Sequence, residues 1–121
     1  MATIESNLPP TNEDVELFIG KVNFRLPQGF MEFYKETNGA YINGEKKNIV
    51  LWPLMDLMQF NTDYKVDIYA PEFFIFGSDG GGMAYAIEKD TGFIFEMPFI
   101  GMSKEEALFI SEIFGGFIET L

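Results

Sequence analysis

The stretch FFIFGSDGGGMAYAIE, residues 73–88, decides the fold of this chain of 121 residues. Residues 73–76 are apolar at every position, which is typical of a central strand that is covered on both faces. Residues 77–82 are rich in glycine and predict a turn, after which large apolar side chains recur at every second position over 83–87. Two strands joined by a short turn pair antiparallel, so this stretch predicts a β-hairpin.

The segments on either side extend the predicted sheet. Further strand-like segments are residues 41–42, 49–52 and 93–97. Polar connections with turn residues, such as Lys89–Gly92, separate consecutive strands. Strands that follow one another through turns favour an α+β class with a mainly antiparallel sheet of about four to six strands.

Helical spacing precedes the sheet. Thr11 is placed to cap a helix whose apolar stripe runs from Val15 to Val22, with acidic residues in its first turn, where the helix dipole favours them. A second helix follows Leu26-Pro27 and is stopped by Asn38-Gly39. We expect residues 1–10 to be a flexible leader and residues 11–121 to form a single domain.

The end of the chain predicts a third helix. Ser103 to Glu106 has the S-x-x-E spacing of a capping box, and apolar residues continue at helical spacing to Leu121. We expect this amphipathic helix and the two N-terminal helices to pack on the sheet. The segment Leu54–Pro71 fits no single pattern, and strand, helix and loop stay open there.

The composition excludes several kinds of chemistry. The formal net charge is −11, and the chain contains no histidine and no cysteine. Ser-His and Cys-His catalysis, thiol redox chemistry and nearly all zinc sites need those side chains. A strongly acidic surface repels nucleic acids and anionic membranes and attracts basic proteins. We therefore expect a binding protein with no enzymatic activity and no cofactor. The absence of a signal peptide or membrane-spanning segment in the sequence predicts a cytoplasmic location.

Two motifs that suggest ligand sites have simpler explanations. The glycine-rich residues 77–82 lead into a strand and contain Asp79, whereas a phosphate loop leads into a helix and avoids a nearby carboxylate. The twelve residues that begin at Asn61 lack the ligand and the glycine that an EF-hand needs at its fifth and sixth positions. A looser cation site that uses Asp63, Asp67 or Asp79 stays open, but our main interpretation includes no metal.

Two motifs together resemble those of the SUKH superfamily. Leu26-Pro27, with aromatic residues and then Asn38-Gly39, resembles its LP…F…NG signature, and Phe74–Tyr85 is similar to its strand, G-x-D-G-G-G, strand signature. The positions that carry these motifs, which we expect to be structural, are Leu26, Pro27, Phe30, Phe33, Asn38, Gly39, Gly77, Gly80, Gly81 and Gly82. The chain departs from the superfamily at Ala40, where a second glycine is common, and throughout Leu54–Pro71.

The resemblance implies a non-catalytic protein that binds another protein. Bacterial members are typically immunity proteins that neutralise a polymorphic toxin, often a nuclease, while yeast cell-wall-assembly regulators of the Smi/Knr type imply a regulatory scaffold as the alternative. A nuclease binds phosphates and is usually basic, so an acidic inhibitor would complement it. We expect a monomer or a weak homodimer. The candidate partner-binding residues are Trp52, Asp56, Asp63, Asp67, Glu72 and Asp79.

Overall fold

One antiparallel sheet organises residues 3–121, the part of the chain that the computed structural model describes, and it contains seven strands in sequence order. The strands are β1 (Thr3–Ser6), β2 (Ala40–Asn43), β3 (Asn48–Leu51), β4 (Phe73–Ser78), β5 (Met83–Glu88), β6 (Ile94–Pro98) and β7 (Leu108–Ser111). The predicted α+β class and the β4–β5 hairpin are confirmed. The number of strands exceeds the predicted four to six, because both ends of the chain contribute one strand each.

Seven short helices connect or flank the strands within residues 3–121. They are α1 (Asn12–Lys21), α2 (Phe30–Glu36), η1 (Leu54–Asp56), α3 (Leu57–Asp63), α4 (Val66–Tyr69), η2 (Lys104–Glu106) and α5 (Phe114–Glu119), where η marks a 3₁₀ helix. Thr11 caps α1 as predicted, because its side chain accepts a hydrogen bond from the Asp14 N–H. None of the helices in the described part of the chain is long and apolar enough to span a membrane.

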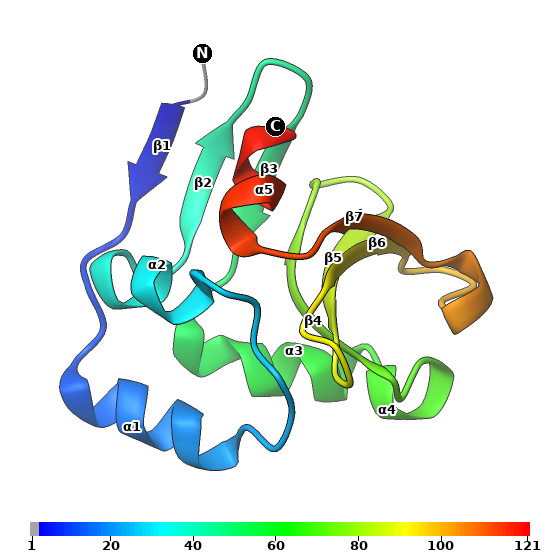
Figure 1. The fold of residues 1–121 in the computed structure, drawn as a ribbon, viewed down its shortest axis with the longest axis horizontal. Coiled ribbons are helices and arrows are strands. Elements are labelled where there is room, and N and C mark those ends of the chain that lie inside the picture. Colours follow the sequence, from blue (N-terminus) through cyan, green and yellow to red (C-terminus); the bar gives the residue numbers. More distant parts are fainter. Residues whose placement is uncertain (1–2) are drawn as a thin grey trace.

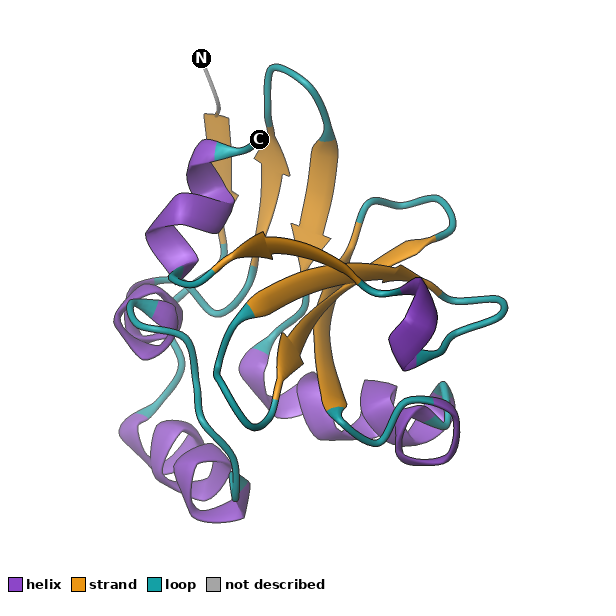
Figure 2. Ribbon diagram, turned by 45° about the vertical axis from the view of Figure 1, so that its right-hand side comes forward, coloured by secondary structure: helices purple, strands orange, loops and turns teal. Residues whose placement is uncertain are grey.

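The sheet twists strongly along its length. The first three strands and the last two run across one another (Figures 1 and 2). Helices α3 and α4 lie together beside the β4 region, whereas α5 lies beside the first three strands. An aromatic core fills the space between the helices and β4. Phe30 of α2 contacts Phe76 of β4 and Phe114 of α5, each with nearly perpendicular rings. The LP…F…NG motif therefore supplies core residues, as predicted for Phe30.

The N-terminal segment differs from the flexible leader that we expected. Within it, Thr3–Ser6 forms β1 and pairs with β2 in the register Thr3↔Asn43 to Ser6↔Ala40. Asn7 then continues the attachment, since its side-chain amide donates to the Asn38 carbonyl at 2.7 Å. The backbone N–H and C=O groups of Thr3–Ser6 find partners at the edge strand β2, and this pairing orders the segment.

The predicted C-terminal helix is also wrong over its first half. Ser103 has an extended backbone and no capping hydrogen bond from its side chain, and η2 is a single turn. Leu108–Ser111 is strand β7, which pairs with β6, and the Phe109 ring contacts the Phe95 ring at 5.6 Å. Sheet pairing and aromatic contacts outweigh a local helical pattern here. An α-helix, α5, forms only over Phe114–Glu119 near the end of the pattern.

Candidate protein-binding surface

The end of strand β3 positions the segment in which most candidate residues lie. The Leu54 N–H donates to Asn38 Oδ1 at 2.7 Å, and the Tyr34 hydroxyl donates to the Trp52 carbonyl at 2.9 Å. Burial raises the pKa of Tyr34 above its ordinary value, which is already high enough to keep the hydroxyl protonated as a donor at physiological pH. Helix α2 and its Asn38-Gly39 stop therefore fix where the chain leaves the sheet and enters η1 and α3.

Trp52 is a core residue and not the exposed contact that we considered. Its side chain is 8% exposed and stacks on the Phe60 ring at 4.1 Å between centroids. The Trp52 N–H also donates to the Phe76 carbonyl at 3.1 Å, which ties it to β4. Trp52 therefore supports the surface above it and is not available to a partner.

Three aromatic side chains lie over Trp52 and form a surface that we call the aromatic row: Phe60, Tyr64 and Phe99. Phe60 and Tyr64 are one helical turn apart, with nearly parallel rings. Phe99 follows β6 and brings its ring to 4.6 Å from the Tyr64 ring. Tyr64 is 42% exposed, so the row presents an aromatic face to solvent.

A hollow lies at each end of the aromatic row. The first, of about 170 Å³, is lined by Asp56, Gln59, Phe60 and Asp63. The second, of about 310 Å³, is lined by Tyr69 and the turn that contains Phe99, Ile100 and Met102. Only the first hollow contains carboxylates, so the surface has an acidic end and an apolar end.

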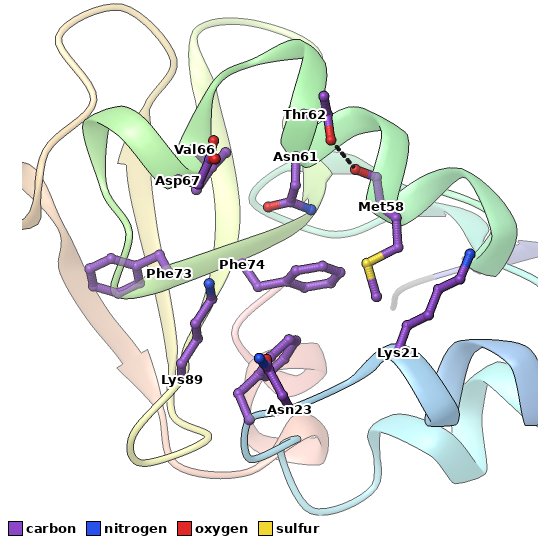
Figure 3. Close-up of a pocket in the computed structure, with 11 residues that line it drawn as sticks. Lys21, Asn23, Met58, Asn61, Thr62, Val66, Asp67, Phe73, Phe74 and Lys89 are labelled. Carbon is purple, nitrogen blue, oxygen red and sulfur yellow. Dashed lines mark hydrogen bonds between the residues drawn. The ribbon is translucent and has the colours of Figure 1, made fainter.

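The structure separates Asp67 and Glu72 from Asp56 and Asp63. Asp67 lines a different hollow of about 250 Å³, together with Lys21 and Lys89, and Figure 3 shows the two lysines entering from different sides. The Glu72 carbonyl accepts a hydrogen bond from the Lys89 N–H at 2.8 Å, which places Glu72 next to the same lysine. Of the predicted acidic contacts, Asp56 and Asp63 line one hollow together.

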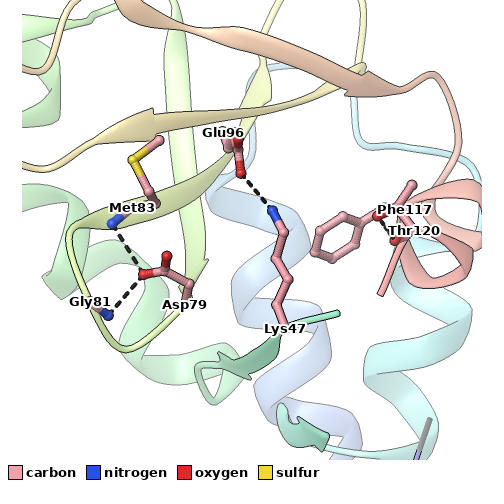
Figure 4. Close-up of polar contacts among 7 residues, drawn as sticks. All are labelled: Lys47, Asp79, Gly81, Met83, Glu96, Phe117 and Thr120. Carbon is pink, nitrogen blue, oxygen red and sulfur yellow. Dashed lines mark hydrogen bonds and ion pairs between the residues drawn. The ribbon is translucent and has the colours of Figure 1, made fainter. Parts of the chain in front are cut away.

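Asp79 folds back onto its own glycine-rich turn. One oxygen, Oδ1, accepts from the Gly81 N–H at 2.8 Å and from the Met83 N–H at 3.2 Å (Figure 4). This arrangement is an Asx-type turn, in which a short carboxylate replaces a backbone acceptor. The role of Asp79 in this geometry is to shape the turn that precedes β5.

Replacing Asp79 with alanine should lower the free energy of unfolding by about 1 kcal/mol, because two backbone donors lose their acceptor at a partly exposed site. Asp79→Asn keeps an oxygen acceptor and should remain within about 0.5 kcal/mol of the wild type. Denaturant titration measures both values. An alanine variant as stable as the wild type would show that the two hydrogen bonds do not stabilise the turn.

The carboxylates at the acidic end of the row have no ion-pair partner within residues 3–121. Among residues 3–121, Lys47 Nζ and Glu96 Oε2 form an ion pair at 3.1 Å (Figure 4), and neither Asp56 nor Asp63 forms one with another residue of that range. Asp63 does accept a hydrogen bond from the Gln59 side chain at 2.8 Å. The described residues contain no group of three or more Asp or Glu placed to hold a metal ion.

The residues that sequence reasoning missed are Phe60, Asn61 and the turn around Ile100. Phe60 and Tyr64 have i, i+4 spacing after Trp52, a signal that was present in the sequence once the segment was assigned as helix. Asn61 attaches α3 to β4 through hydrogen bonds to both backbone groups of Ile75. Nothing in the local sequence connects Ile100 to Tyr69 of α4, because the fold alone brings the two to one hollow.

In a comparison with known protein families, one family profile matches this chain. The profile described as the SMI1 / KNR4 family (SUKH-1) matches residues 9–120, nearly the whole chain. A search of curated proteins gives no match. The family match covers both motifs noted in the sequence and the whole aromatic row. The chain therefore belongs to the SMI1 / KNR4 family (SUKH-1).

Proposed function

We propose that this protein is a bacterial immunity protein that neutralises a cognate toxin by stoichiometric binding. The observation that carries the proposal is the family match over residues 9–120, since this family suggests immunity-type or regulatory binding proteins. The absence of histidine and cysteine from the sequence agrees with a role in binding. The protein would act by covering the toxin's substrate site, with no chemical step of its own.

The charge of the chain supports a basic toxin, such as a nuclease. A nuclease surface binds phosphates through lysine and arginine, and the carboxylates of Asp56 and Asp63 would take the place of phosphates. A net charge of −11 attracts such a surface from a distance. Electrostatic complementarity of this kind mainly raises the association rate, so inhibition would be fast at low salt concentration.

Co-expression with a toxin tests the proposal. The probe is the C-terminal domain of a secreted protein encoded beside this gene, and the expected result is that growth of cells producing the toxin is restored by this protein. Absence of protection, together with absence of binding at low salt concentration, would contradict the immunity role. Protection without any complex of defined stoichiometry would contradict the mechanism.

A paired charge variant tests the electrostatic part. Asp56→Asn/Asp63→Asn should slow association with the toxin domain by about three- to ten-fold and reduce its dependence on salt concentration. Glu32→Gln/Glu36→Gln on α2 is the matched control, because it removes the same charge from another exposed helix surface. Equal effects from both variants would mean that the net charge acts alone, without a contribution from the position of Asp56 and Asp63.

A further inference from the structure

Two large side chains at the second hollow are strongly exposed to solvent and have no evident role in the core. Ile100 is 93% exposed and Tyr69 is 57% exposed, and both line the hollow of about 310 Å³ at the end of the aromatic row. Single exposed apolar residues are common on protein surfaces, but adjoining ones rimmed by polar residues are typical of interaction sites. Tyr64 continues this exposed surface through its contact with Phe99.

The framework beneath these side chains is held in place before any partner binds. Trp52 lies under the row, and its rings are 6.5 Å from both Tyr64 and Phe99 between centroids. The Phe99 N–H donates to the Gly82 carbonyl at 2.9 Å, so the glycine-rich turn supports the turn that carries Ile100. A preformed surface loses little conformational freedom on binding, which favours affinity.

The charge around the surface selects the kind of partner. Asp56 and Asp63 line the hollow at one end of the row, and neither forms an ion pair with another residue of 3–121. A second copy of this chain would bring another net charge of −11 to the interface, which disfavours self-association there. A basic partner has the complementary charge.

We propose that the aromatic row and the hollow at Ile100 are the docking surface for a basic protein, which places an apolar side chain in the hollow at Tyr69 and Ile100 and an arginine or lysine at Asp56 and Asp63. The inference rests on the proposed binding function and adds the location and chemistry of the interface. The apolar contacts provide most of the affinity in such an interface, and the charged end provides orientation and speed of association.

The test measures binding of the same toxin domain by calorimetry at low and at high salt concentration. Tyr69→Ser/Ile100→Ser should weaken binding by about 30-fold or more, with the salt dependence unchanged, because the variant removes apolar contacts and no charge. Leu8→Ser is the matched control, since Leu8 is 86% exposed and lies in the β1–α1 connection on the opposite side of the molecule from the β6–η2 turn (Figure 1). Binding of the double variant within about three-fold of the wild type would overturn the proposed surface.

Failure of the proposed function gives a different result. If the wild type does not bind the toxin domain, the immunity role is overturned. The surface is then tested separately, by placing a photo-crosslinking amino acid at position 100 and crosslinking in the native host. The expected result is a crosslink to a basic protein whose co-purification is lost in Tyr69→Ser/Ile100→Ser and kept in Leu8→Ser. A crosslink from position 8 and none from position 100 would overturn the surface as well.

Discussion

Replacing Gly39 with alanine is expected to lower the free energy of unfolding by about 3–5 kcal/mol, through left-handed backbone strain and steric overlap together. Gly39 has a φ angle of 78°, which L side chains rarely adopt. An added Cβ would also lie 2.8 Å from the Trp52 carbonyl carbon and overlap the Leu51 carbonyl oxygen. These neighbours are backbone atoms at the end of β3, so a side-chain rotation cannot relieve the overlap.

Gly80→Ala separates the two causes. Gly80 has nearly the same φ angle, 77°, but its added Cβ would meet nothing within 4 Å. This control should therefore lose only about 1–2 kcal/mol, the cost of the left-handed conformation alone. Denaturant titration of both variants gives the comparison. Equal losses would show that the close approach of Gly39 to β3 contributes nothing to stability.

The same position explains why the LP…F…NG motif ends in Asn-Gly. Gly39 allows the backbone after α2 to approach the end of β3, and Asn38 Oδ1 accepts from the Leu54 N–H just beyond it. Both residues act on the point where the chain turns from the sheet toward η1 and α3. We therefore infer that the motif determines the position of the aromatic row without contacting a partner itself.

The correct predictions depended on local signals. The helix that begins after Thr11 has its capping residue and its apolar stripe within one short stretch, and the β4–β5 hairpin likewise has its alternating apolar residues and its turn. The Ser103 capping pattern also looked complete, yet residues 108–111 form β7, because β6 offers backbone partners and Phe95 offers a ring for Phe109. A prediction from local periodicity does not take into account a pairing strand that lies more than ten residues away in the chain.

The candidate surface was predictable only in part for the same reason. Asp56 and Asp63 are seven residues apart, so the assignment of one helix would have placed them on one face. The Ile100 hollow depends on a contact between Tyr69 and a turn about thirty residues later in the chain, which no spacing rule connects. Trp52 was ambiguous from sequence, because both core and interface favour tryptophan at the end of a strand.

Asn61→Ala is expected to lower the free energy of unfolding by about 2–4 kcal/mol, because it leaves two backbone groups of a buried strand without partners. Strand β3 pairs with β4 only at Val50↔Ser78 and Leu51↔Gly77. Further along β4, the Asn61 side chain takes the place of a neighbouring strand. Its Nδ2 donates to the Ile75 carbonyl at 2.9 Å, and its Oδ1 accepts from the Ile75 N–H at 2.8 Å.

Thr62→Ala is the matched control for this substitution. Thr62 is the next residue of α3, is exposed, and donates only to the Met58 carbonyl within its own helix, so its removal should cost less than about 0.5 kcal/mol. Amide hydrogen exchange adds a local readout, since Asn61→Ala should speed exchange of the Ile75 N–H while Thr62→Ala leaves it protected. An unchanged Ile75 exchange rate in Asn61→Ala would contradict the idea that this side chain replaces a strand.

Because the same hydrogen bonds hold α3 against β4, their loss should also displace Asp56, Phe60 and Asp63. The Asn61→Ala variant should therefore weaken partner binding although it removes no contact residue.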